Sequence, residues 1–318
     1  MAFYRPDLGT EVPGASAASN AVRDALRGKR LHPAEIVFQI GLLVMLLIAL
    51  GVLLTLLIQV TTEAMPVFRS RGGDFLTSPN SSLPFNAGVG QGIVGSALLI
   101  VLVVIFAVPI GIGAAIYLEE YAVDTWFTRL LNTNIRNLAG VPSIVYGLLG
   151  LAVFAEALRS ITGGTSVIAG GLTLSVLVLP IVIITSAEAL RAVPASIREA
   201  GYGVGATKWE VIRSHVLPSA APGVLTGTVL TIARALGETA PLLLVGSLLG
   251  FFAPGAGTIV QRLRGPYTSL PTVIFGWATQ PNAEYRSLTA AAIVVLLVVL
   301  LSLNAVAITL RNRYERRW

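Results

Sequence analysis

The residues Ile36–Val60, IVFQIGLLVMLLIALGVLLTLLIQV, decide the class of fold. This run contains no charged residue and exceeds the roughly 20 apolar residues that an α-helix needs to cross a bilayer. It is also too long for the apolar core of a signal peptide, which spans about 7 to 15 residues. We therefore predict a transmembrane helix that stays in the mature protein.

Five further apolar runs follow the first one and are separated by polar segments. They lie at Ile93–Tyr117, Leu138–Ala155, Ser166–Ala187, Gly223–Gly250 and Ser287–Leu310. The whole chain is 54% hydrophobic and only 12% charged, with a mean hydropathy of +0.79, which excludes an ordinary soluble globular protein. The sequence predicts an all-α membrane protein with six transmembrane helices, in a domain that spans residues 36–310.

The two ends of the chain differ from this domain in composition. Residues 1–35 are rich in Ala, Gly, Ser and Pro, mix both charge signs and show no apolar period, so we predict a mobile tail. Residues 311–318 form a short basic end. The chain has no cysteine, which excludes disulfides, thiolate metal sites and a cysteine nucleophile.

The basic residues predict the orientation in the membrane. If the six runs cross in turn, fifteen Lys and Arg residues lie on the side of the N-terminal tail and six lie on the other. Basic residues accumulate in cytoplasmic loops, so both termini are predicted to be cytoplasmic in a multi-pass inner-membrane protein. The net charge of +6 belongs to these loops and does not indicate a nucleic-acid partner.

Three prolines lie well inside apolar runs: Pro109, Pro180 and Pro241. A proline inside a helix frees a backbone carbonyl and bends the helix. These residues are candidate hinges around a translocation path, or ordinary kinks that pack against neighbouring helices.

Residues 188–221 form the longest predicted cytoplasmic loop, and the sequence favours two short helices there. Pro194 can open the first helix, and the Gly201–Gly205 segment supplies a turn. Thr207 and Glu210 have the spacing of a capping box, and Pro218 is expected to stop the second helix. A folded helix pair can transmit force as a rigid body, whereas the alternative is a surface helix that touches lipid headgroups.

Two ionisable residues, Arg234 and Glu238, lie near the midpoint of the fifth run. Their spacing puts them on one helical face, which we expect to be shared by Gly227, Thr228, Thr231 and Ala235. Charges in mid-membrane are costly and usually mark a pathway, and a guanidinium suits an oxyanion because it gives two parallel hydrogen bonds. We predict that Arg234, Glu238 and Thr231 line a substrate pathway. The alternative is an ion pair that only fixes helix packing.

The predicted loop resembles the EAA loop of ABC importer permeases. The resemblance rests on six positions, Glu199, Ala200, Gly201, Gly205, Leu217 and Pro218. It departs at Gly201, where alanine is usual, and at His215, where an aliphatic residue is usual. The resemblance implies that these six residues couple the chain to an ATPase subunit.

Further motifs resemble the permease subunits of phosphate-specific ABC importers, the PstA family more than its sister family PstC. They are Ala107–Glu119 (AVPIGIGAAIYLE), Leu138–Gly147 (LAGVPSIVYG), Arg234–Pro241, Leu270-Pro271 and Trp277-Ala278. The resemblance implies a type I ABC importer permease fold that translocates inorganic phosphate. The implied partners are a PstC-like permease, a dimer of PstB-like ATPase subunits and a PstS-like phosphate-binding protein that docks on the outer loops 61–92 and 251–286.

No G-x-x-x-x-G-K-[ST] phosphate loop occurs in the chain, so ATP and Mg are expected on the partner ATPase and no cofactor, metal or catalytic residue on this chain. Within the family, the alternatives are the PstC subunit or a permease for another oxyanion. Two other classes are a secondary anion carrier, which should show an inverted repeat, and a phosphate-sensing membrane scaffold, which should show an output domain. The sequence shows no convincing repeat and only short cytoplasmic ends.

Overall fold

The computed structural model describes residues 33–247 and 258–314, and every regular element among them is helical. The chain forms two compact units, Met1–Ile58 and Gln59–Trp318. The predicted tail lies outside the described residues up to residue 32, as do the last four residues of the basic end. In the part of the chain that the structure describes, five helices are long and apolar enough to cross a membrane, or six if one bent pair counts as a single span. The all-α membrane fold is therefore confirmed.

The first predicted span belongs to helix α2, which covers Pro33–Arg71. In the first unit its large apolar side chains are exposed, as a lipid-facing helix requires. The helix continues beyond the predicted end at Val60, and its last part belongs to the second unit. There Ala64 and Val67 join a buried cluster with Phe75.

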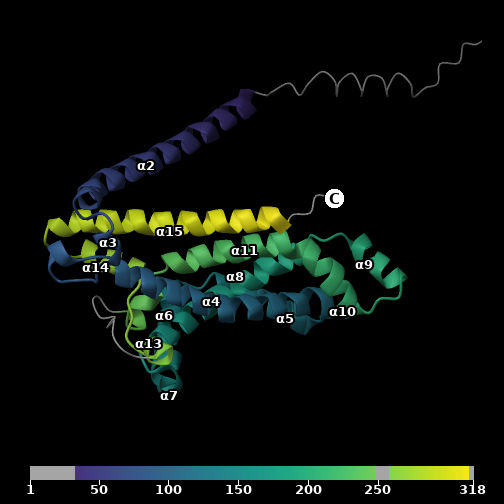
Figure 1. Ribbon diagram of the computed structural model, residues 1–318. Helices are drawn as coiled ribbons and strands as arrows, with labels where there is room; N and C mark the ends of the chain where they lie inside the picture. The colour runs from purple at the N-terminus through teal and green to yellow at the C-terminus, as the bar shows by residue number, and fades with distance from the viewer. Residues whose placement is uncertain (1–32, 248–257, 315–318) are drawn as a thin grey trace, which may run out of the picture. The chain divides into compact units, whose positions relative to one another are not determined.

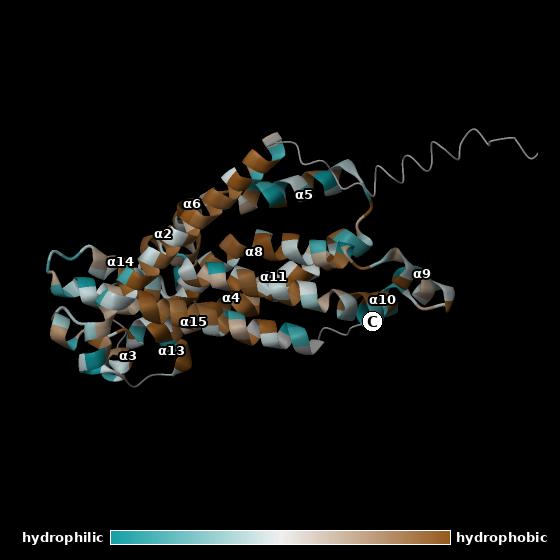
Figure 2. Cartoon of the chain, turned by 90° about the horizontal axis from the view of Figure 1, so that it is seen from above, coloured by the Kyte–Doolittle hydropathy of each residue, from teal (hydrophilic) through white to brown (hydrophobic). Residues whose placement is uncertain are grey.

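Four long helices pack side by side in the second unit (Figure 1). They are α4 (Gly90–Ile116), α8 (Val167–Arg191), α11 (Leu217–Gly237) and α15 (Glu284–Tyr314). Figure 2 shows hydrophobic residues along the middle of α4 and α15 and hydrophilic residues toward helix ends, which is the pattern of membrane-spanning helices. Helix α8 is the most buried of the five candidate spans, so it forms the centre of the bundle.

Shorter elements occupy the ends and one side of this bundle. At one end lie α3 (Asp74–Thr77), η1 (Pro84–Asn86) and α14 (Leu270–Ala278), and at the other lie α9 (Ala195–Gly203) and α10 (Lys208–Val211) (Figure 1). The remaining elements are η2 (Tyr117–Tyr121), α5 (Trp126–Ala139), α6 (Ser143–Gly150), η3 (Leu151–Ala157), α7 (Arg159–Thr162), η4 (Ile212–Val216), α12 (Ala240–Leu244) and α13 (Ile259–Leu263). The elements η2, η3 and η4 are π-helical.

The third predicted span, Leu138–Ala155, is wrong in its boundaries. Helix α5 ends at Ala139, and a new helical segment begins at Ser143 after a bend of 98°. The cause is local, because Pro142 has an extended ψ of 135° and cannot continue a helix into its neighbour. The apolar stretch is therefore one arm of a bent pair.

The fifth predicted span, Gly223–Gly250, is also wrong as a single helix. The helical segment starts much earlier, at Lys208, and ends at Gly237. Glu238 has an extended ψ of 126°, and the short helix α12 follows, with Pro241 in its first turn. The end of the predicted span at residues 248–250 lies outside the described residues.

Pro218 does not stop the second loop helix, contrary to our prediction. It lies in the first turn of α11, which continues directly from the π-helical turn η4. In η4 the backbone N–H of Leu217 donates to the carbonyl of Ile212, five residues back. This wider turn changes the backbone hydrogen bonds at the point where the proline ring would otherwise clash with the preceding turn. The helix therefore continues through Pro218.

The two other predicted hinge prolines lie within unbroken helices, Pro109 in α4 and Pro180 in α8. The segment between α13 and α14 buries a tyrosine against Gly170, near the start of α8. Tyr267 is fully buried, and its hydroxyl donates to the carbonyl of Leu242 at 3.4 Å. Burial raises the pKa of Tyr267, so the phenol stays neutral and acts as a packing and hydrogen-bonding group.

Candidate functional site

Arg234 and Glu238 mark the point where the fifth span breaks. Arg234 lies in the last turn of α11, and Glu238 is the first residue after the helix. Arg234 Nε lies 3.4 Å from Glu238 Oε1. A cation in the last turn also complements the negative end of the helix dipole, so the position of Arg234 is favourable even before any ligand binds.

The guanidinium of Arg234 remains largely open in this chain. Its side chain is 53% exposed, against 17% for Glu238. Among residues 33–247 and 258–314, Glu238 is the one acidic residue within ion-pair distance of Arg234. Four other exposed residues of α11, all uncharged, lie on the same face as Arg234: Gly223, Thr226, Leu230 and Gly237.

The face that we predicted around Arg234 is split by the fold. Gly227, Thr228, Thr231 and Ala235 are all buried inside the chain. Thr231 is 1% exposed and donates to the carbonyl of Gly227 at 2.8 Å. A Cβ at Gly227 would lie 2.6 Å from Thr185 of α8, so these small residues allow close packing of α11 on α8. Of the three predicted pathway residues, Arg234 and Glu238 lie together, whereas Thr231 lies beneath the exposed face.

The break after α11 brings two of the sequence motifs together. Pro241 lies in the first turn of α12, which packs against α6. A Cβ at Gly147 of α6 would lie 2.7 Å from the Cα of Pro241. The segment Leu138–Gly147 therefore packs against the segment Arg234–Pro241. Pro241 lies at the start of a helix, whereas the sequence had placed it inside one.

Of the helix pair predicted in residues 188–221, α9 is a separate short helix, whereas α10 is the first part of the continuous helical segment Lys208–Gly237. Thr207 Oγ1 accepts from the backbone N–H of Glu210 at 3.4 Å, and the Thr207 N–H donates to Glu210 Oε2 at 2.7 Å, which completes the capping box. Gly205 has a φ of +81°, so only glycine adopts this turn without strain. Both signals were therefore read correctly from the sequence.

The six predicted coupling residues divide into exposed and structural positions. Glu199, Ala200 and Gly205 are exposed, whereas Gly201 is buried. A Cβ at Gly201 would lie 2.7 Å from Val211 Cγ2, which explains why glycine replaces the usual alanine here. Leu217 and Pro218 open α11, about one helical turn beyond His215. The chain therefore presents Glu199 and Ala200 outward while Gly201 holds α9 against α10.

Sequence analysis missed the acidic end of α4. Glu119 and Glu120 lie in η2, next to Arg191 at the end of α8 and Arg198 of α9. The signal was visible in part, because two adjacent acidic residues follow an apolar span on the side where basic residues accumulate. The pairing itself connects residues 72 and 78 positions apart, which no local pattern predicts.

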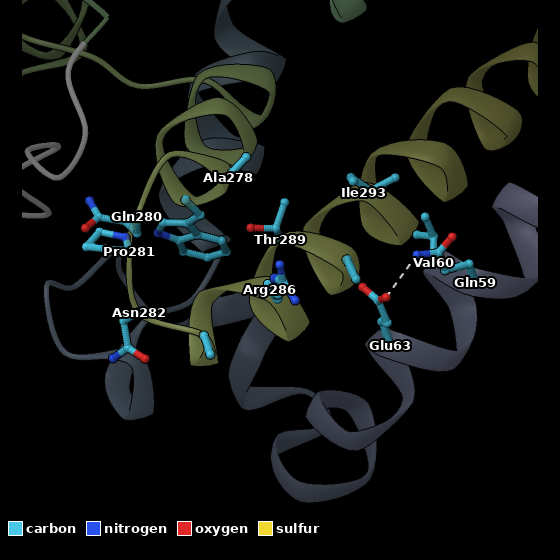
Figure 3. A pocket seen from close by; sticks show the side chains of 13 residues that line it. Gln59, Val60, Glu63, Ala278, Gln280, Pro281, Asn282, Arg286, Thr289 and Ile293 are labelled. Carbon is cyan, nitrogen blue, oxygen red and sulfur yellow. Dashed lines mark hydrogen bonds between the residues drawn. The ribbon is translucent and has the colours of Figure 1, made fainter.

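The opposite end of the bundle holds a pocket of about 770 Å³ between the end of α2, α14 and the start of α15. Figure 3 shows Glu63 and Arg286 on its walls, with Gln59 donating to Glu63 at 3.2 Å. The buried Trp277 forms part of the lining and donates to Asn80 at 3.0 Å. The pocket lies next to the predicted outer loops. Within the described ranges no group of three or more His, Asp or Glu side chains could hold a metal ion.

These features define a helical membrane protein in which one span breaks at an ion pair and short helices lie at the ends of the bundle. A family model described as "Binding-protein-dependent transport system inner membrane component" matches residues 107–318. The chain belongs to this family.

Several relatives share a substantial part of the sequence. "Phosphate transport system permease protein PstA" of Yersinia pestis is 36% identical over 229 residues, which cover 72% of this chain and 73% of that protein. "Probable ABC transporter permease protein YqgH" of Bacillus subtilis is 33% identical over 294 residues, which cover 89% and 90%.

Solved structures support the fold. A bacterial alginate ABC transporter, in complex with an alginate pentasaccharide-bound periplasmic protein, aligns with a TM-score of 0.60 at 19% identity, over 89% of this chain and 99% of that one. The MetNI methionine ABC transporter, in an inward-facing conformation, aligns with a TM-score of 0.55 at 17% identity, over 72% and 95%. The fold is that of type I ABC importer permeases, as predicted.

Proposed function

We propose that the chain is the PstA-like permease subunit of an ATP-driven importer of inorganic phosphate in the inner (plasma) membrane. The main support is its similarity to phosphate transport permeases named PstA, at 36% identity to the protein of Yersinia pestis. The exposed guanidinium of Arg234 gives a chemical reason, because it can donate two parallel hydrogen bonds to a phosphate.

In this proposal Arg234 and Glu238 line the pathway where the chain meets a second, PstC-like permease. A guanidinium that is 53% exposed on an apolar helix needs a polar neighbour in the membrane, and a pathway between two subunits supplies one. Glu238 weakens the grip on the anion so that it can leave, or accepts a proton from a phosphate hydroxyl. Sulfate lacks such a hydroxyl at neutral pH, so this step favours phosphate.

The energy comes from a dimer of PstB-like ATPase subunits, which bind ATP and Mg, while this chain carries no cofactor and no catalytic residue. The exposed Glu199 and Ala200 of α9 offer the contact with the ATPase. A PstS-like phosphate-binding protein docks at the other end of the bundle, near the 770 Å³ pocket. Helices α9 and α10 lie at the other end of the bundle from α14 (Figure 1), and α14 lines the pocket, so this arrangement fits a cytoplasmic and an outer partner.

Reconstitution in liposomes tests the transport function. We expect uptake of labelled phosphate that requires this chain, a PstC-like permease, the ATPase, ATP and the binding protein. Uptake by this chain alone on an ion gradient would instead support a secondary carrier. Uptake of another oxyanion but not of phosphate would refute the assignment of phosphate as the substrate.

The similarity to YqgH over 89% of this chain keeps the PstC-like role as a second candidate within the same importer. Complementation separates the two roles. A strain that lacks its PstA subunit should recover phosphate uptake with this chain, and a strain that lacks PstC should not. The reverse result would assign the PstC-like role.

Variants of the helix pair test the coupling role. Glu199→Lys reverses the charge of the exposed contact, and Gly205→Pro cannot adopt the φ of +81°. Both should abolish ATP-driven uptake while the chain still inserts, because insertion depends on the apolar spans. Normal uptake in Glu199→Lys at normal expression would remove the coupling assignment.

A topology reporter tests the orientation. A fusion that is active only in the cytoplasm should be active after Trp318 and near Lys208, and inactive near Gly257. Activity near Gly257 would contradict the six-span topology with both termini in the cytoplasm.

A further inference from the structure

Three consecutive residues of η2, at the end of α4, each contact a basic side chain from the last residue of α8 or from the segment that follows it. The pairs are Glu119 with Arg191, Glu120 with Arg198, and the ring of Tyr121 with Lys208. Lys208 Nζ lies 5.0 Å from the Tyr121 ring centroid. The end of one membrane helix is therefore attached to the last residue of α8, to α9 and to α10.

Arg198 is the most completely bonded of these basic residues. Its Nη2 donates to Glu120 Oε1 at 2.7 Å, and its Nε donates to both carboxylate oxygens, to Oε1 at 3.2 Å and to Oε2 at 3.4 Å. Its Nη1 donates to the carbonyl of Val193 at 2.8 Å, and Nη2 also donates to the carbonyl of Leu190 at 3.0 Å. The Glu120 side chain is only 4% exposed and that of Arg198 21%, so water competes weakly for these bonds.

The Leu190 carbonyl lies in the last turn of α8, and the Val193 carbonyl lies two residues after that helix ends, where the helical hydrogen-bond pattern stops. Arg198 satisfies them and at the same time pairs with the carboxylate at the end of α4. A single side chain of α9 thus joins the ends of the two helices that pack along each other in the bundle. An ordinary surface ion pair would not provide this connection, because it joins only two flexible side chains.

Neighbouring residues on α9 have opposite surroundings. Arg198 is directed to α4 and α8, whereas Glu199, the next residue, is exposed. Adjacent positions on a helix point about 100° apart, so one face of α9 is free for a partner while the other is fixed to the membrane helices.

We propose that Arg198 and Glu120 form the joint through which a displacement of α9 moves α4 and α8 together. The inference rests on the proposed coupling role of α9. A bidentate, charge-assisted contact transmits a rigid-body shift because its two parallel bonds resist both sliding and rotation. Arg198 and Glu120 act as positioning residues and touch neither phosphate nor ATP.

The test uses the complete importer in liposomes and measures phosphate transported per ATP hydrolysed. In Arg198→Gln the partner ATPase keeps its catalytic site, so hydrolysis continues, but we expect phosphate per ATP to fall about tenfold, a typical coupling factor. Arg198→Lys keeps the charge without the planar fork and should fall between Arg198→Gln and the unmodified chain.

Arg129 provides a matched control. It pairs with Asp124 at 3.2 Å, but both side chains are exposed, at 71% and 82%. Arg129→Gln removes the same charge from a pair that joins no helices, so phosphate per ATP should stay unchanged. A merely structural role for Arg198 would lower the yield or thermal stability of the importer and leave the ratio normal.

The outcomes separate this inference from the proposed function. A normal ratio in Arg198→Gln overturns the joint, even if Glu199→Lys abolishes uptake and the coupling role stands. If Arg198→Gln does not assemble, the ratio in Arg198→Lys and Glu120→Gln decides, and normal values in both overturn it. No ATP-driven phosphate uptake by the unmodified importer would instead refute the proposed function.

Discussion

Two arginine–glutamate pairs of this chain use their hydrogen-bonding capacity to very different extents. Arg198 makes bidentate contact with Glu120 and also donates to two backbone carbonyls, with side chains that are 21% and 4% exposed. Arg234 meets Glu238 at a single distance of 3.4 Å and is 53% exposed. The guanidinium of Arg198 uses its donors within the folded chain, whereas the guanidinium of Arg234 keeps donors available for a ligand.

The difference teaches what each pair can do. The Arg198–Glu120 pair joins residues 78 positions apart, so it exists only when the bundle is folded and can hold that bundle together. The Arg234–Glu238 pair is separated by four positions and forms within one turn, so it adds little to the tertiary structure. Free donors at Arg234 are what an anion pathway requires, and a structural pair would not leave them exposed.

The largest expected effect is that of Arg234→Ala, which removes the open guanidinium. Phosphate uptake should be lost although the importer still assembles, because a dianion in mid-membrane would face its desolvation cost without a cation from α11. Uptake is measured in liposomes at matched protein level, with Arg129→Ala as the control for loss of one positive charge. Unmodified uptake in Arg234→Ala would leave only a packing role for this pair.

Arg234→Lys sharpens the comparison by keeping the charge. If two parallel hydrogen bonds matter, uptake should recover only to about a tenth of the normal rate. A full recovery would mean that Arg234 acts as a point charge, and the bidentate role would then have to be given up.

Glutamine substitutions should separate the two pairs by their effect on stability. Glu120→Gln leaves the saturated Arg198 without its counter-charge and should lower the free energy of unfolding by about 2 kcal/mol. Glu238→Gln should leave the yield and thermal stability unchanged while it alters phosphate uptake or the preference for phosphate over sulfate. Thermal unfolding and competition assays measure the two effects. A loss of folded importer in Glu238→Gln, with normal transport in the remainder, would make the Arg234–Glu238 pair structural.

The smallest effect is expected for Thr231→Val. Thr231 is 1% exposed, and its hydroxyl donates to the Gly227 carbonyl of its own helix. That carbonyl keeps its backbone hydrogen bond within the helix, so loss of the hydroxyl leaves no buried group without a partner. Phosphate uptake should change less than about twofold, which corresponds to under about 0.4 kcal/mol. A large loss of uptake with normal stability would return Thr231 to the pathway.

Local signals in the sequence predicted a large part of the fold. The apolar runs marked the membrane helices, and the spacing of Thr207 and Glu210 marked the start of α10. The turn at Gly205 was also predicted correctly, because glycine adopts a positive φ without strain whatever its tertiary surroundings. Helix breaks were harder to predict, since an apolar run looks the same whether it forms one straight helix or two arms, as at Pro142 and Glu238.

The sequence by itself determined the membrane class, the capped start of α10 and the presence of an isolated charge pair in an apolar run. These depend on composition and on neighbours within one or two helical turns. Only the tertiary structure decided that Thr231 is buried while Arg234 is exposed, because both lie on nearly the same side of α11 and the position of α8 separates them. It also decided the partner of Arg198, since a contact across 78 residues depends on how the helices pack and has no local cause.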